Sequence, residues 1–189
     1  MYEKRFNLAH RLIHWAIAFT LLFLLFTILL RMGWMNKDHV GDIIQQNLTR
    51  RGTIISSQDA ALIGKEVRRP MWNWHYYAGY TLIGLYLLRI IITASQGIAY
   101  KSPFSKTATA KEKFKGTLYI LFYILLAGSL FTGFMTVNGP KNLQHTMAAI
   151  HMKGIYYLAT FIILHMGGVL LAELGPEKGI ISKMVSGDK

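Results

Sequence analysis

The chain of 189 residues contains no cysteine, so it has neither disulfide bonds nor cysteine-ligated zinc or iron–sulfur sites. Charged residues are also scarce, at 16% of the chain, and the 9 acidic residues are outnumbered by 21 basic ones. Disorder is excluded, because apolar residues make up 52% and aromatic residues 13% of the chain. The charges lie between apolar runs rather than clustering, so we predict a membrane protein and no nucleic-acid partner.

Four apolar runs are long enough to cross a bilayer as helices, which needs about 20 residues. They cover residues 12–30, 70–88, 116–140 and 143–172, and Lys153 alone interrupts the last one. The first run is too long for a signal peptide and has no A-x-A-like cleavage site after it. We therefore predict an all-α integral membrane protein, a single domain over 1–189 formed by a four-helix bundle. The expected helices are about 10–31, 71–95, 115–137 and 145–172.

An even number of spans places both ends of the chain on one side of the membrane. By the positive-inside rule this is the cytoplasmic side, so we expect both termini to be inside. The basic residues behind this expectation lie before the first span, in the second connection and in the tail: Lys4, Arg5, Arg11, Lys101, Lys106, Lys111, Lys113, Lys115, Lys178, Lys183 and Lys189.

The outer connection, residues 32–69, is too long to be a simple turn. We predict a short surface helix in the segment SSQDAALIGKEV, with Ser57 as its N-cap. This connection also contains two basic pairs, Arg50–Arg51 and Arg68–Arg69. They would either steer a small anion or an acidic protein surface toward the membrane, or anchor the loop to lipid headgroups.

Histidines inside the spans point to the chemistry, because ionisable groups at membrane depth usually mark function. Four of the seven histidines lie in apolar runs on three helices: His14, His75, His151 and His165. His10, His39 and His145 lie at membrane edges or in a loop and are weaker candidates. His151 and His165 are 14 residues apart, which is about 21 Å along a helix and close to the same face. Depth in the bilayer then pairs His14 with His165 and His75 with His151.

Two facing histidines are suitable axial ligands for haem iron, and ligation from both sides favours electron transfer over oxygen activation. Structural zinc needs four ligands at one point, which two pairs about 21 Å apart do not provide. Covalent c-type attachment requires cysteine, so two haems b are the preferred cofactors. We identify His14, His75, His151 and His165 as the candidate iron ligands.

Two arginines are candidates for binding the haem propionates. Arg89 follows His75 by 14 residues and so lies at the depth of the inner pair, His14 and His165. Its guanidinium suits a carboxylate, although snorkelling to the interface explains its position equally well. Arg11 has the same two interpretations.

These motifs together form a family pattern. IHW at 13–15, WHYYAG at 74–79 followed by LLR at 87–89, and the H-x13-H pair resemble the prokaryotic cytochrome b561 family. That family shares a domain with the b-type cytochrome subunits of nickel–iron hydrogenases. The resemblance implies a four-helix bundle in the bacterial cytoplasmic (inner) membrane, with two haems b held at the four histidine positions.

The resemblance also implies electron exchange with membrane quinone. We therefore expect a quinone-linked electron-transfer oxidoreductase that passes electrons between the quinone pool and a redox partner. One alternative is a superoxide oxidase that reduces quinone, as one member type of the family does. The other is a b-type cytochrome subunit that anchors a peripheral or extracytoplasmic dehydrogenase or hydrogenase-like protein.

Overall fold

The computed structural model describes residues 7–97, 102–175 and 178–187. It is 83% helical, and no strand occurs in these residues, which confirms the prediction of an all-α protein. Four helical segments are long and apolar enough to cross a membrane. Four of the basic residues used to orient the chain lie outside the described residues: Lys4, Arg5, Lys101 and Lys189.

The helices divide between two compact units, residues 1–17 with 83–189 and residues 18–82, and each unit is considered by itself. In chain order the helices are α1 (Leu8–Met32), α2 (Lys37–Arg50), α3 (Ser57–Val67), α4 (Arg69–Gln96), α5 (Ala110–Asn138), α6 (Lys141–Met152), α7 (Gly154–Leu174) and α8 (Ile180–Val185). The membrane-spanning segments are α1, α4, α5 and the consecutive pair α6–α7.

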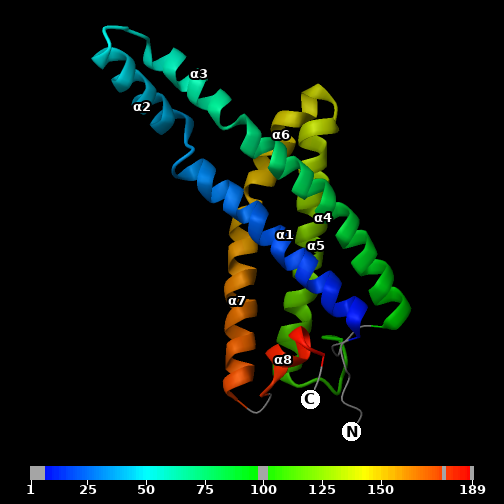
Figure 1. Ribbon diagram of the computed structural model, residues 1–189. Helices are drawn as coiled ribbons and strands as arrows, with labels where there is room; N and C mark the ends of the chain where they lie inside the picture. Colours follow the sequence, from blue (N-terminus) through cyan, green and yellow to red (C-terminus); the bar gives the residue numbers. More distant parts are fainter. Residues whose placement is uncertain (1–6, 98–101, 176–177, 188–189) are drawn as a thin grey trace. The chain divides into compact units, whose positions relative to one another are not determined.

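In the unit 18–82, the connection between the first two spans folds into an antiparallel hairpin of α2 and α3 (Figure 1). The two helices pack closely because glycines face each other. A Cβ atom at Gly64 would collide with the backbone carbonyl of Lys37, and one at Gly41 would lie 2.9 Å from the amide nitrogen of Ala61. Sequence patterns predicted α3 but not α2, whose mean hydropathy is low. The N-cap of α3 is Ser56 and not the expected Ser57.

In the other unit, α5 packs against both α6 and α7. It begins at Ala110, five residues before the expected start at 115, because Thr109 and Glu112 form a capping box there. The buried side of α5 includes Phe122, whose ring stacks on Phe161 of α7 with 3.7 Å between centroids. This contact places α7 beside α5 at the depth of His165.

The last span is two helices rather than the single helix expected over 145–172. Around Lys153 the backbone hydrogen bonds change to an i→i−3 pattern, from the Lys153 amide to Ile150 and from the Tyr156 amide to Lys153. Gly154 follows directly, and a Cβ there would lie 2.8 Å from the Ser129 hydroxyl of α5. The irregular turn therefore lies at a close approach of the last span to α5.

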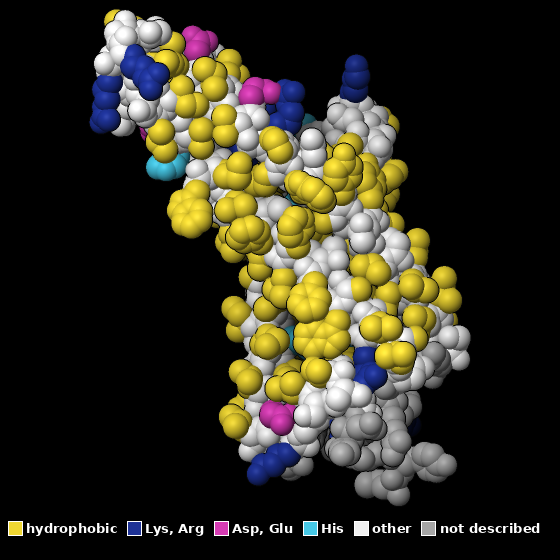
Figure 2. Space-filling model, in the orientation of Figure 1, with side chains coloured by type: hydrophobic (Ala, Val, Ile, Leu, Met, Phe, Trp, Pro, Cys, Tyr) yellow, Lys and Arg dark blue, Asp and Glu magenta, His cyan; other side chains and the backbone are white. Residues whose placement is uncertain are grey.

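All four spans expose large apolar side chains, and Figure 2 shows many of them on one face of the molecule. On α7 no residue is buried, although its composition is strongly apolar. A helix that is apolar all round and still exposed is suited to lipid rather than water. The protein is a multi-pass membrane protein, as the sequence predicted.

Candidate metal centres

The inner histidine pair comes together in the unit formed by residues 1–17 and 83–189. His14 of α1 and His165 of α7 have ring centroids 6.2 Å apart, with 51° between the ring planes. Two imidazoles on opposite sides of one metal, each with its nitrogen at about 2 Å, have centroids roughly 6 Å apart. The spacing of these two side chains therefore fits ligation of a single iron.

Aromatic side chains hold both imidazoles of this pair. The His165 ring stacks on Phe161 with 5.4 Å between centroids and 10° between planes, and Tyr119 of α5 contacts its edge. His14 lies edge-on to Trp15, whose indole nitrogen donates a hydrogen bond to the Met184 carbonyl of α8. No sequence pattern signals this contact, because it joins two residues that are 169 positions apart.

Arg89 turns inward beside this pair rather than toward solvent. Its Nε donates to the Tyr123 hydroxyl at 3.2 Å, and its Nη1 donates to the His10 carbonyl at 3.4 Å. Tyr86 donates in turn to the Tyr123 carbonyl. These two hydrogen bonds hold the Arg89 guanidinium between α1 and α5, near the inner histidine pair. In this position the guanidinium could bind a carboxylate group.

Arg11 presents buried donors without acceptors. Its Nε and Nη1 are buried and have no hydrogen-bond partner in the part of the chain that the structure describes. The guanidinium lies against Gly187, where a side chain would overlap it. A buried charged donor without a partner is costly, so these donors suit an anionic group. A haem propionate, the group predicted for Arg11 from the sequence, carries such a charge.

His151 is held against α5 by a glycine and a backbone carbonyl. Its Nδ1 lies 3.0 Å from the carbonyl oxygen of Ser129 and 3.5 Å from the Thr132 hydroxyl. A Cβ at Gly133 would lie 2.8 Å from the imidazole Cε1, so only glycine leaves room for the ring. Because a carbonyl oxygen only accepts, Nδ1 carries the proton and the lone pair is on Nε2.

His75 is oriented within the unit 18–82. Its Nδ1 lies 2.7 Å from the Thr27 hydroxyl of α1, and Trp72 contacts its ring edge-on at 5.4 Å. His75 and His151 belong to different units, so their pairing stays a prediction. No group of three or more histidine or acidic side chains that could hold a metal occurs in the described ranges.

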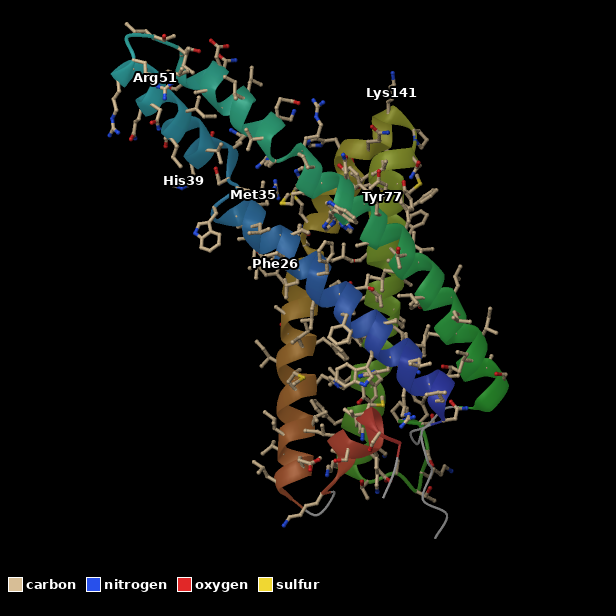
Figure 3. All side chains as sticks on the ribbon, in the orientation of Figure 1. Phe26, Met35, His39, Arg51, Tyr77 and Lys141 are labelled. Carbon is tan, nitrogen blue, oxygen red and sulfur yellow. The ribbon has the colours of Figure 1, made fainter. Side chains whose placement is uncertain are left out.

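The three weaker histidine candidates differ in exposure, and the two arginine pairs differ in position. His39 and His145 are exposed, whereas His10 is buried. Figure 3 shows Arg51 at the far end of the α2–α3 hairpin. Arg69 forms an ion pair with Glu66, and Arg68 lies at the junction of α3 and α4. The two expected basic pairs therefore occupy opposite ends of the hairpin.

A family model described as prokaryotic cytochrome b561 matches residues 5–187, nearly the whole chain. Neither the comparison with curated proteins nor that with solved structures gave a match.

Proposed function

Since the chain belongs to the prokaryotic cytochrome b561 family of membrane b-type cytochromes, we propose that it carries electrons between two haems b stacked across the membrane. Members of this family bind haem b and transfer electrons, so membership supports both properties for this chain. The 6.2 Å spacing of the His14 and His165 rings is the observation that supports the two-haem arrangement best. It brings together two histidines that are 151 residues apart and were paired by depth alone.

Each proposed haem has its own protein ligands. His14 and His165 hold the inner haem, with Arg89 and Arg11 binding its propionates. His75 and His151 hold the outer haem through their Nε2 atoms. A bis-histidine haem supplies one-electron transfer with no open position on the iron. The residues around it keep the imidazoles oriented and neutralise the propionate charge.

The electrons are exchanged with membrane quinone and with a redox partner at the other face. The orientation is that of a bacterial inner-membrane protein with both termini in the cytoplasm, which the basic inner connection and tail support. In this orientation the α2–α3 hairpin lies on the outer side, next to the start of α4 and His75.

The hairpin favours a second candidate function, that of a cytochrome subunit for an extracytoplasmic redox protein. Its helices are closely packed, so it is an ordered projection. Near its end Ile54 is 88% exposed beside the exposed Arg50 and Arg51. An apolar residue among cations suits the surface of an acidic protein better than it suits a small anion such as superoxide.

The haem content of the purified protein tests the proposal most directly. We expect two haems b per chain by pyridine haemochrome assay, with low-spin bis-histidine signals in electron paramagnetic resonance. Quinol added to the protein alone should reduce both haems. A content near zero would refute the cytochrome function, and a content near one would remove the outer site.

A further inference from the structure

A buried threonine of α1 contacts the proposed ligand His75. Thr27 is 2% exposed, and its hydroxyl lies 2.7 Å from the His75 Nδ1. The same hydroxyl donates to the Leu24 carbonyl at 2.6 Å. A hydroxyl has a single proton, which the bond to Leu24 uses. Thr27 therefore accepts from His75, and the proton of the imidazole lies on Nδ1.

The hydrogen bond determines which nitrogen of His75 can bind a metal. With the proton on Nδ1, the lone pair lies on Nε2, as it does in His151 through the Ser129 carbonyl. The two histidines reach the same tautomer with different acceptors, a hydroxyl in one case and a carbonyl in the other. Hydrogen bonding of the second ring nitrogen also makes an imidazole a stronger electron donor to its metal.

We propose that Thr27 is a positioning residue that selects the His75 tautomer and lowers the reduction potential of the haem that His75 holds. The inference rests on the proposed function. A stronger donor stabilises ferric iron over ferrous iron, so loss of the hydroxyl raises the potential.

Thr27→Val tests this inference, because it keeps the shape of the side chain and removes the acceptor. We expect the redox equilibrium of one haem to shift three- to tenfold toward the reduced form. This corresponds to about 30–60 mV for one electron. Potentiometric titration followed by optical spectra measures it, and the electron paramagnetic resonance of the same haem should change. Thr27→Ser retains the hydroxyl and should differ from the parent less than twofold.

Thr81→Val is the matched control, since Thr81 lies on the helix of His75, is exposed, and its hydroxyl donates to the Tyr77 carbonyl of the same helix. It should leave both potentials unchanged. Selective loss of one haem in Thr27→Val but not in Thr27→Ser would also support the role of the hydroxyl. Two bound haems with unchanged potentials in Thr27→Val, or equal effects of valine and serine, would overturn the inference while leaving the cytochrome function intact.

A second, independent feature of the unit 18–82 is a pair of arginines at the base of the hairpin. The guanidinium carbon of Arg31 lies 5.6 Å from the centre of the Trp72 ring, and this ring contacts His75. Nearby, the Nε of Arg68 is buried and has no hydrogen-bond partner in the described segments. Burial lowers the pKa of Arg68, the positive charge of Arg31 lowers that pKa further, and Asp38 opposes the effect.

We infer that Arg31 and Arg68 form an oxyanion site next to His75. The ligand is a carboxylate or phosphate group, supplied either by a propionate of the outer haem or by an anion from outside the protein. The inference uses the proposed outer haem only as one of these two sources. The unpaired Nε of Arg68 is stabilised by such a group, which accepts its hydrogen bond and offsets the repulsion between the two cations.

The variants Arg31→Gln and Arg68→Gln test the site, with Arg69→Gln as the matched control because Arg69 is exposed and paired with Glu66. Removing a positive charge beside the haem should shift its redox equilibrium three- to tenfold toward the oxidised form, about 30–60 mV. This shift is opposite in sign to that of Thr27→Val. Arg69→Gln should shift it less than twofold.

Inorganic phosphate separates the two sources. If a propionate fills the site, added phosphate leaves the potential of the parent protein unchanged while the glutamine variants still shift it. If the anion comes from outside, phosphate changes the potential of the parent and not that of Arg68→Gln. The site is refuted if both glutamine variants match Arg69→Gln in potential and in phosphate response.

Discussion

Replacing His14 or His165 by alanine is expected to leave one haem per chain instead of two. Both variants should lose the same spectral component, because their rings face each other at a spacing that one iron fills. The reduction potential of the remaining haem should stay nearly unchanged, so that its redox equilibrium constant shifts by no more than a few-fold. Haem content by pyridine haemochrome assay and redox-resolved optical spectra measure these outcomes.

The exposed histidines provide the control for this experiment. His145→Ala changes a histidine near the start of the last span that is exposed in the structure, and it should retain both haems. Loss of different components in His14→Ala and His165→Ala would contradict the pairing. Retention of both haems in either variant would exclude that histidine as a ligand.

Replacing His75 or His151 by alanine should remove the other haem and leave the His14–His165 component unchanged. The two histidines are held by separate residues, Thr27 of α1 and Ser129 of α5, and their depth along the spans predicts that they share one iron. Identical spectra for the two alanine variants would support that pairing. Loss of different components would show that they serve different sites.

Gly133→Val offers a second route to the same haem without changing a ligand. The added side chain would occupy the space of the His151 imidazole, whose Cε1 lies 2.8 Å from the position of a Cβ. We expect selective loss of the His75–His151 component. Gly128→Val is the control on α5, since a Cβ there meets no atom within 4 Å. A normal haem content in Gly133→Val would contradict the position of His151.

Sequence alone determined the class of protein and the ligand candidates. Hydropathy and helix length are local properties of the chain, so uncharged runs revealed the four spans. The 14-residue spacing of His151 and His165 predicted two levels in the bilayer from the geometry of one continuous helix. The structure divides the two histidines between α6 and α7, with the turn at Lys153 between them. The family motifs around His14 and His75 are likewise short segments, and the match over residues 5–187 confirmed the family.

Sequence patterns missed features that depend on the partner of a segment. The α2 helix is weakly apolar and packs closely on α3 through Gly41 of α2 and Gly64 of α3, which no periodicity in α2 signals. The turn at Lys153 lies where the last span approaches Ser129, so only the neighbouring helix explains it. The adjacent Gly154 is the one local signal of a close approach.

The tertiary structure decided how the ligand side chains are held. Thr27 and His75 are 48 residues apart, and Ser129 and His151 are 22 apart. Such hydrogen bonds form only when two helices pack at one rotation and one depth, which hydropathy does not specify. Helix packing also determines that donor atoms of Arg11 and Arg68 are buried, which hydropathy does not specify either. Composition and spacing thus predicted which residues bind iron, while helix packing determined which nitrogen each of His75 and His151 presents.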